Sequence, residues 1–387
     1  GDGGSATAAG IYYPCGGVFD KFGNFYFGEG IGGYRVRKIS FSGIVSTYAG
    51  TGFSGYSGDG GPATLAKLKN PQAVTVDTAG NLFIADAYDA RIRRVDAISG
   101  IISTVAGTGV SGYNGDGIAA TSAQLAAPID LCFDRMGNLY IADYGTGCRV
   151  RRIDASGIIN TFAGTGYPIY GGDGGLADTT SIDPPSAICF DTAGNLYIGD
   201  WHGYVQKVNT SGIISTYAGI GVSGSGGDGT PATSAMTEPF KLAFDRHGNL
   251  FIAEYGFNKI RMVSSAGIIT TVAGTGISGF SGDGGLATAA KMDHPAGLTV
   301  DSCNNLYIAD SRTYYIRKVN FHPACGMPDA TTSVNSPLST VVELSIYPNP
   351  VNDLLNIIIK GNSSEKINIE IYSLQGEKVY GAKDLVL

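Results

Sequence analysis

Short stretches in which apolar residues alternate with small or polar ones recur along most of the chain. In Pro71–Asp77 the alternation has the period of two expected of a β-strand. The turn residues Thr78–Asn81 separate it from a second apolar run, Leu82–Ala85. Two more strands are expected at Arg91–Val95 and Ile101–Ala106. This part of the chain therefore predicts one antiparallel sheet, whose strands we call A, B, C and D in chain order.

The phrase Asp-x-x-Gly-Asn-Leu-Tyr/Phe-Ile-Ala-Asp, which joins strands A and B, recurs in six near-copies. Its first residue falls at Asp20, Asp77, Asp134, Asp191, Asp245 and Asp301, with spacings of 57, 57, 57, 54 and 56 residues. A period of this size, built of short strands and Gly-rich turns, is typical of a radial array of four-stranded blades. The sequence therefore predicts an all-β fold, a six-bladed β-propeller with about 57 residues per blade.

A long connector leads from each strand D to the next strand A and carries a second repeated phrase, Gly-Asp-Gly. An Ala/Thr-rich stretch follows, such as Pro62–Leu68, and we expect it to form one or two helical turns. The Asp then lies where a side-chain cap is needed for the first free N–H groups. These structural cap residues are Asp2, Asp59, Asp116, Asp173, Asp228 and Asp283. Calcium is the alternative, but each loop offers one carboxylate and an EF-hand-like spacing is absent, which favours capping.

Both repeated phrases resemble the NHL family of propellers, particularly the subgroup with Ala-Gly-Thr-Gly followed by Gly-Asp-Gly-Gly-x-Ala-Thr-x-Ala. The resemblance covers residues 1 to about 320 and recurs around the ring. It implies a domain that serves mostly as a recognition platform, although a few relatives are enzymes. We assign residues 1–325 to this propeller domain.

The two ends of the repeat array are incomplete in complementary ways. The chain opens with Gly1–Ala8, which is the second half of a connector without a preceding strand D. The sixth repeat has strands A to C, from Leu298 to Asn320, but no counterpart of strand D follows. We expect a precursor segment ahead of Gly1 to supply the missing strand. The alternative is a strand donated by another molecule.

The last part of the chain has a different composition. Residues 326–342 are rich in Ser, Thr, Pro and Asn and are predicted to be a linker, and residues 343–387 alternate strands with Gly/Asn turns, which suggests a small β-sandwich. The motifs Tyr347–Pro350, Asp353–Leu354 and Ile369–Tyr372 resemble the C-terminal sorting domain of bacterial type IX secretion cargo.

The resemblance implies a Gram-negative protein that passes through the periplasm and is then secreted or kept at the cell surface. The type IX secretion machinery is its implied partner. The family pattern runs on for roughly two more strands, so the domain is expected to be incomplete at Leu387.

Charge and hydropathy exclude several classes of partner. The net charge is −7 and no Lys/Arg-rich run occurs, which disfavours binding to nucleic acid or to an anionic membrane surface. No apolar run approaches the ~20 residues needed to span a bilayer. Among the cysteines, Cys132 and Cys189 share one position in neighbouring repeats and are expected to be buried free thiols. The others, Cys15, Cys148, Cys303 and Cys325, lie near loops or ends and could form disulfides in an exported protein.

The sequence offers no catalytic constellation. His247 is expected on the face of the A–B turns, His202 and His294 on the opposite face, and His322 at the end of the array, so the histidines do not converge on a metal. The phrase at Gly50–Gly55 matches a dinucleotide-binding fingerprint, but it recurs with the blade period and is better explained as turn chemistry. We therefore predict no enzyme, no catalytic residue, no metal site and no cofactor, with calcium as the one alternative.

The most informative asymmetry is aromatic. The B–C loops carry, at one equivalent position, Gly30, Ala87, Tyr144, Trp201, Tyr255 and Ser311, and the connectors add Tyr56, Tyr113, Tyr170 and Phe280. The three loop aromatics each follow an acid, namely Asp143, Asp200 and Glu254. Rings beside carboxylates could stack on a sugar or clamp an extended peptide. The alternative is that these rings pack between blades or against the connectors.

The sequence thus favours a secreted or cell-surface binding propeller without enzymatic activity. Its predicted ligand is a glycan or a protein segment, held by Tyr144, Trp201 and Tyr255 with polar contacts from Asp143, Asp200 and Glu254. One alternative is a structural subunit of an extracellular assembly or adhesin, with homo-assembly as one form. Another is a metal-dependent propeller hydrolase or lyase.

Overall fold

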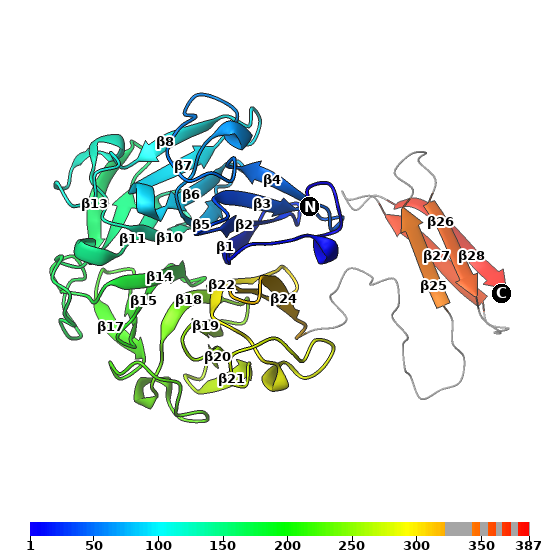
Figure 1. Ribbon diagram of the computed structural model, residues 1–387. Coiled ribbons are helices and arrows are strands. Elements are labelled where there is room, and N and C mark those ends of the chain that lie inside the picture. The colour runs from blue at the N-terminus through cyan, green and yellow to red at the C-terminus, as the bar shows by residue number, and fades with distance from the viewer. Residues whose placement is uncertain (322–342, 349–354, 361–365, 373–377, 387) are drawn as a thin grey trace. The chain divides into compact units, whose positions relative to one another are not determined.

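The computed structural model describes residues 1–321 and the strands at 343–348, 355–360, 366–372 and 378–386. The chain divides into two compact units, Gly1–His322 and Pro323–Leu387. The first unit is a ring of six antiparallel sheets, shown in Figure 1. This confirms the predicted six-bladed all-β propeller.

Each sheet contains consecutive strands of the chain. Blade one has β1 (Pro14–Phe19), β2 (Phe25–Glu29), β3 (Arg35–Ile39) and β4 (Val45–Ala49), and blade two has β5 (Pro71–Val76), β6 (Leu82–Asp86), β7 (Arg91–Val95) and β8 (Ile102–Ala106). Blade three has β10 (Pro128–Phe133), β11 (Leu139–Asp143), β12 (Arg149–Ile153) and β13 (Ile158–Ala163), and blade four has β14 (Pro185–Phe190), β15 (Leu196–Asp200), β16 (Val205–Val208) and β17 (Ile214–Ala218). Blade five has β18 (Pro239–Phe244), β19 (Leu250–Glu254), β20 (Lys259–Val263) and β21 (Ile269–Ala273), and blade six has β22 (Pro295–Val300), β23 (Leu306–Asp310) and β24 (Tyr315–Val319).

Strand A of every blade lies at the centre of the ring, and the strands follow outward in chain order. Strands β1, β5, β10, β14, β18 and β22 contact one another in sequence, and β22 contacts β1, so the inner ring is closed. The apolar core is divided among the gaps between blades. In one such gap Ile92 of blade two packs with Leu131 and Ile141 of blade three, and all three are buried. Packing between neighbouring sheets therefore holds the ring together.

The repeated Asp-x-x-Gly-Asn phrase forms the A–B turn. In blade two the Asn81 N–H donates to Asp77 Oδ1 at 2.8 Å, and the Asn81 side-chain amide donates to Asp77 Oδ2 at 2.7 Å. The Asn81 side-chain oxygen accepts the N–H of Ala97 in the C–D turn at 3.0 Å. One phrase thus fixes the A–B turn and the C–D turn on the same face. The sequence pattern predicts the first of these two turns.

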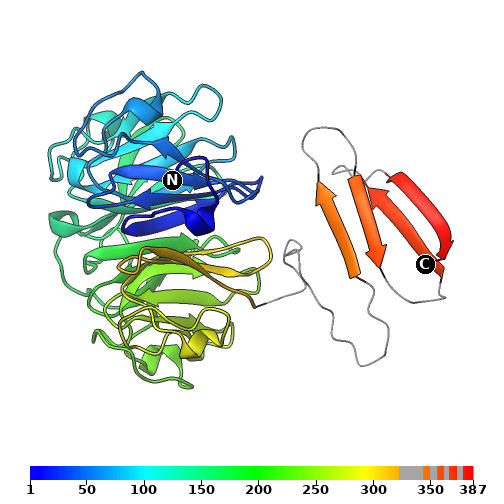
Figure 2. The same ribbon diagram turned by 45° about the vertical axis from the view of Figure 1, so that its right-hand side comes forward.

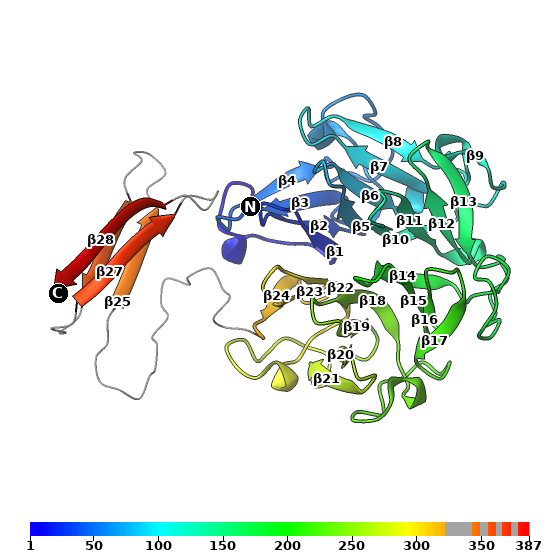
Figure 3. The ribbon, with the colours of Figure 1, turned by 180° about the vertical axis from the view of Figure 1, so that it is seen from behind.

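The connectors cover the outer edges of the sheets. Gly60 and Ala63 donate their N–H groups to the carbonyls of Ile102 and Gly100, both at 2.9 Å, on the free edge of blade two. In blade three the connector forms a fifth strand, β9 (Ile118–Ala119), beside β13, as Figure 3 shows. Each of these two connectors therefore protects the edge of the blade that follows it, an edge that would otherwise be free to pair with another chain.

The Ala/Thr-rich stretches form single 3₁₀ turns: η1 (Ala6–Ala8), η2 (Ala63–Leu65), η4 (Ala120–Ser122), η6 (Ala232–Ser234) and η7 (Ala287–Ala289). Two further 3₁₀ turns, η3 (Ala87–Asp89) and η5 (Gly145–Gly147), lie in B–C loops. The capping role predicted for the Gly-Asp-Gly carboxylates is wrong, because the cap position before η2 is Pro62 and no side chain bonds there.

The Gly-Asp-Gly carboxylates hold the next blade instead. Asp59 Oδ1 accepts from Arg93 of strand C at 2.5 Å, and Asp59 Oδ2 accepts the N–H of Thr104 of strand D at 3.1 Å. This occurs because the connector runs along the sheet edge and turns the carboxylate toward it. Partial burial raises the pKa of Asp59, but the Thr104 hydrogen bond and the Arg93 charge outweigh this and lower it overall.

The arginine of this clasp is buried in most blades. Arg93, Arg151 and Arg261 have no exposed surface, and Arg37 and Arg317 occupy the same position in blades one and six. The equivalent position in blade four is Gln206. There Asp173 accepts only neutral donors, the Tyr170 hydroxyl at 2.9 Å and the Thr216 N–H at 2.7 Å.

The cysteines only partly follow the expectation. Cys132 and Cys189 are free thiols, as predicted, although they are half-buried, and desolvation raises both pKa values well above the usual range. Cys15 and Cys148 are free and buried, so neither forms the disulfide that its position allowed. Cys303 takes part in a disulfide.

The second unit contains two strand pairs. β25 (Glu343–Pro348) pairs with β26 (Leu355–Lys360), and β27 (Lys366–Tyr372) pairs with β28 (Lys378–Val386), both antiparallel. The predicted sandwich and the boundaries at 326 and 343 remain predictions. His322, Cys325, the linker 326–342 and the motif residues Asn349, Pro350, Asp353 and Leu354 lie outside the described residues.

We expect Asp116→Ala to destabilise the propeller more than Asp173→Ala. Removing Asp116 leaves Arg151 buried without its carboxylate, at a cost of about 2 kcal/mol once the partial exposure of Asp116 is allowed for. Removing Asp173 forfeits hydrogen bonds from neutral donors, worth about 1 kcal/mol. Equilibrium denaturation in urea measures both. Equal losses of unfolding free energy in the two variants would show that the ion pair of Asp116 with Arg151 adds nothing to the stability of the edge contact.

Candidate ligand site on the B–C face

Every strand B ends in an acidic residue that is at most 1% exposed: Glu29, Asp86, Asp143, Asp200, Glu254 and Asp310. Asp143 accepts the N–H groups of Ala126 and Ala127, at 2.8 and 3.0 Å, and so ties the last residues of the connector to the end of strand B. Asp200 accepts the N–H groups of His202 and Tyr204 in its own B–C loop. These carboxylates hold loops in place.

This placement corrects the sequence-based prediction for the three acids. Asp143, Asp200 and Glu254 were expected to offer polar contacts to a ligand, but the structure buries them under the loops that they hold. Burial is the main cause of a raised pKa of about 7 for each of the three. Asp143 and Asp200 meet backbone N–H groups of adjoining loops, and Glu254 meets the Arg261 guanidinium, before they reach solvent.

Two of the three predicted aromatic residues come together. Trp201 lies 6.3 Å from Tyr255, measured between ring centroids, and both rings contact Phe240, at 5.2 and 4.6 Å. His294 packs edge-on against Tyr255 at 4.4 Å. We call these four residues, Trp201, Phe240, Tyr255 and His294, the aromatic cluster; Trp201, Phe240 and Tyr255 are half-buried. Within the described chain Tyr144 makes no ring contact.

Sequence reasoning missed two members of the cluster. Phe240 is the second residue of strand A in blade five, where the other blades have Cys15, Gln72, Ile129, Ser186 and Ala296. An alignment of the strands A would have revealed this aromatic exception. His294 directly precedes β22 and has a positive φ of 59°, and its ring bonds to Asp293 at 2.5 Å. A trio of tyrosines, Tyr12, Tyr13 and Tyr314, adds further ring contacts of 5.1 to 5.4 Å between blades six and one.

A buried ion pair crosses the centre of the ring next to the cluster. The third residue of strand A is small in four blades, Gly16, Ala73, Ala187 and Gly297, whereas blades three and five carry Asp130 and Lys241. Lys241 Nζ bonds to Asp130 Oδ1, and each residue is 6% exposed. A Cβ atom at Gly16 would lie 2.9 Å from Lys241 Cε. The small residues therefore leave the room that this side chain occupies.

The connector aromatics serve packing, which supports the alternative interpretation for them. Tyr56 and Tyr113 lie over the guanidinium groups of Arg91 and Arg149 at 3.7 and 3.8 Å. Tyr170 stacks on Tyr204 at 4.3 Å, and Phe280 stacks on Tyr315 at 4.4 Å. In each case the ring rests on the first part of strand C in the next blade.

The described histidines pair with neighbours. His202 lies 2.9 Å from Asp183, and His247 lies beside Asn304 in the turn of the next blade. Among the described residues, no group of three or more His, Cys, Asp or Glu side chains is arranged to hold a metal ion. A search of the same residues for a helix long and apolar enough to cross a membrane found none.

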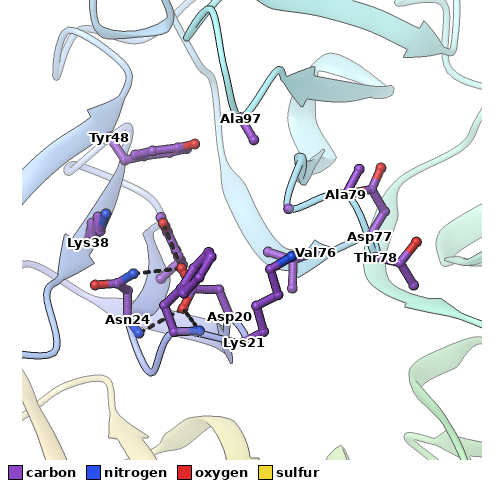
Figure 4. A pocket seen from close by; sticks show the side chains of 13 residues that line it. Asp20, Lys21, Asn24, Lys38, Tyr48, Val76, Asp77, Thr78, Ala79 and Ala97 are labelled. Atoms are coloured by element: carbon purple, nitrogen blue, oxygen red, sulfur yellow. Dashed lines mark hydrogen bonds between the residues drawn. The ribbon is translucent and has the colours of Figure 1, made fainter. Parts of the chain in front are cut away.

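A hollow of about 560 Å³ lies on the opposite face, between the A–B turns of blades one and two. Figure 4 shows Lys21, Lys38 and Tyr48 around it, together with Asp20. The Asp20 carboxylate already accepts from Asn24 and Tyr26, at 2.7 and 3.2 Å. The Asp20 carboxylate thus stabilises the A–B turn of blade one. We place the candidate site at the aromatic cluster instead.

Comparison with known proteins identifies both parts of the chain. Residues 52–114 match the family model described as a teneurin NHL domain, and residues 345–386 match the secretion system C-terminal sorting domain. The first unit is a six-bladed β-propeller that is similar to NHL-repeat propellers. The chain carries a type IX sorting domain at its C-terminus, which marks it as secreted or displayed on the cell surface.

Individual relatives share the propeller. Mouse teneurin-1 is 28% identical over 287 residues, which cover 70% of this chain and 9% of teneurin-1. Protein SUPPRESSOR OF QUENCHING 1 of Arabidopsis thaliana is 26% identical over 278 residues, 66% of this chain and 25% of that protein. The chain therefore spans a quarter or less of these relatives.

Solved structures share the fold at lower identity. An auxiliary nutrient binding protein of Bacteroides thetaiotaomicron superposes with a TM-score of 0.59 and 17% identity, over 80% of this chain and 69% of that one. A putative gluconolactonase superposes with a TM-score of 0.51 and 15% identity, over 80% and 89% of the two chains. At these identities the likeness concerns the fold alone.

The buried carboxylates predict a pH dependence of stability. Burial holds the pKa of Asp143, Asp200 and Glu254 near 7 in the folded chain, whereas unfolded carboxyls titrate near 4. Between these values the folded state binds more protons, so the free energy of unfolding rises as pH falls from 8 to 5.5. We expect the unfolding temperature to increase by a few degrees, at roughly 2 °C per kcal/mol.

The variant Asp200→Asn should flatten this slope, because the amide oxygen can still accept both N–H groups without carrying charge. The matched control is Asp191→Asn in the same blade, whose carboxyl pKa is lowered overall: burial raises it, but the hydrogen bonds from Asn195 and its other donors outweigh this. It should leave the slope between pH 5.5 and 8 unchanged. An unfolding temperature that falls over this range would contradict the assignment.

Proposed function

We propose that this protein is an extracellular binding propeller without enzymatic activity, and that it holds a glycan or a protein segment on its B–C face. The observation that carries the proposal is the aromatic cluster. Its four rings come from three consecutive blades, four, five and six, while the equivalent loop positions in blades one, two and six are Gly30, Ala87 and Ser311.

The propeller fold does not require such a cluster. The A–B turns and edge clasps repeat in nearly every blade because each blade needs them, whereas Trp201 and Phe240 occur once. Half-buried aromatic rings with one exposed side provide the flat apolar surface on which sugars and peptide planes stack. Glu238 and Asp293 lie next to Tyr255 or His294 and supply polar groups there. Binding by an exported propeller also accords with the name of the Bacteroides thetaiotaomicron protein that shares the fold, an auxiliary nutrient binding protein.

A second candidate function is a structural role in an extracellular assembly. The specific observation that favours it is the outer edge of blade six, where the described residues form three strands instead of four. An enzymatic role has less support, because the acids that precede Trp201 and Tyr255 are buried: Asp200 accepts backbone N–H groups, and Glu254 accepts from Arg261.

The intrinsic emission of Trp201, the single tryptophan, tests the proposal directly. We expect a saturable shift on titration with one class of ligand, from a panel of calcium, polysaccharides and peptides. Phe240→Ala should weaken that binding at least tenfold, because it removes the ring that joins Trp201 to Tyr255. The matched control is Phe41→Ala, an exposed ring on the C–D turn of blade one. Emission that no ligand perturbs would assign the cluster to packing.

A further inference from the structure

The tyrosine trio, Tyr12, Tyr13 and Tyr314, lies next to the aromatic cluster. Blades six and one are neighbours in the closed ring, as Figure 2 shows with β22–β24 in gold beside β1–β4 in dark blue. Tyr12 stacks on Tyr314 with ring centroids 5.4 Å apart, and Tyr13 meets both rings edge-on at 5.1 Å. Tyr13 also lies within electrostatic reach of Tyr255 of the cluster. The two groups of rings therefore lie side by side on the B–C face.

Arg312, in the B–C loop of blade six, adjoins both groups of rings. Its N–H donates to the Asp293 carbonyl at 3.1 Å, directly before His294 of the cluster, and Tyr314 of the trio follows two residues later. Burial raises the pKa of Tyr255, and a hydrogen bond within the trio raises the pKa of Tyr314. The positive charge of Arg312 acts against both shifts, so the guanidinium lies near a hydroxyl of each group.

The charge of Arg312 has no counter-ion in the described part of the chain. Its side chain is exposed and, among the residues that the structure describes, makes neither an ion pair nor a hydrogen bond. The two carboxylates beside the cluster have other partners: Asp293 bonds to His294 at 2.5 Å, and Glu238 accepts the Gly256 N–H at 2.6 Å. The guanidinium is therefore available to a ligand.

The repeat does not require a cation at this position. The equivalent loop residues of blades one to five are Ile31, Tyr88, Gly145, His202 and Gly256. His202 can carry a positive charge, but it lies 2.9 Å from the Asp183 carboxylate. Arg312 is thus a further departure from the repeat on the B–C face, and the fold gives no reason for it.

We propose that Arg312 binds a carboxylate group of the ligand, and that this ligand is an acidic polysaccharide that contains uronic acid residues. The inference rests on the proposed function, because it places the ligand on the aromatic cluster. A guanidinium binds a carboxylate through two parallel hydrogen bonds. The apolar C–H face of a sugar matches an aromatic ring, and its hydroxyl groups match those of the tyrosines. A chain of sugars fits better than one sugar because the rings come from four blades.

An acidic peptide is less well suited to this face. A bound peptide needs partners for its own backbone amides. The loop N–H groups beside the rings already have acceptors, as shown by Ser311, Arg312, Gly256 and His202. Stacked sugars need no backbone donor, because the rings and side chains supply the contacts.

Trp201 emission tests the inference on the full chain. The probes are polygalacturonate and alginate, each compared with the same polymer after reduction of its carboxyl groups, which keeps the sugar chain and removes the charge. We expect a charged polymer to bind at least tenfold more tightly than its reduced form. Equal binding of the two forms would overturn the role of Arg312 and leave the proposed function intact. Emission that responds only to neutral polysaccharides would do the same, whereas emission that no ligand perturbs would end both proposals.

Matched variants locate the charge. Arg312→Gln should weaken binding of the charged polymer at least tenfold, so that the charged and reduced forms bind alike. The control is Arg246→Gln in the A–B turn of blade five, on the opposite face, where an exposed arginine side chain also lacks an ion pair within the described residues. Equal effects of the two variants would show general charge attraction and overturn the site.

Polyglutamate separates the two classes of ligand, because it carries carboxylates without sugar rings. We expect it to bind at least tenfold more weakly than polygalacturonate. Polyglutamate that binds as tightly and depends equally on Arg312 would overturn the polysaccharide in favour of an acidic peptide.

Discussion

The unpaired outer edge of each sheet is the constraint on which the rest of this propeller depends. A ring of separate sheets closes its inner edges by packing strands A together, but every outermost strand keeps a row of free N–H and C=O groups. This chain covers that row with the connector from the preceding blade, and the Gly-Asp-Gly carboxylate locks the connector to an arginine of strand C. The long connectors are therefore part of the sheets, and this explains why their phrase repeats as strictly as the strands.

The arginine clasp also sets what each blade can tolerate. A buried guanidinium needs a charged partner, since an unpaired charge in the interior is strongly destabilising. Blade four avoids the requirement with Gln206, and its aspartate is satisfied by neutral donors. At the centre of the ring the same logic appears once more, because Asp130 and Lys241 are buried as a pair where four blades have Gly or Ala. A residue that departs from the repeat is thus accompanied by a second change that satisfies its charge or its hydrogen bonds.

The strands, turns and blade number could be predicted from the sequence because period-two alternation and Gly-Asn turns are local signals that repeat. The pairing of Trp201 with Tyr255 could also be predicted from the sequence, since equivalent loop positions in adjacent blades lie close together. The role of Asp143, Asp200 and Glu254 could not be predicted in this way, because their burial depends on how the adjoining loops fold. The function of Asp59 and its counterparts was missed for a similar reason: their partners, such as Arg93 and Thr104, lie 34 and 45 residues away and belong to the next blade.

In a repeat protein, residues shared by all blades report on the fold, and residues that depart from the repeat are candidates for function. The clearest departures are in the aromatic cluster. Phe240 stands where no other blade has an aromatic residue, and Trp201 is the single tryptophan, at a loop position that holds tyrosine in two other blades. In blade six the contact between Asp283 and Arg317 repeats the pattern of the other blades, so it reports on the fold and not on a ligand.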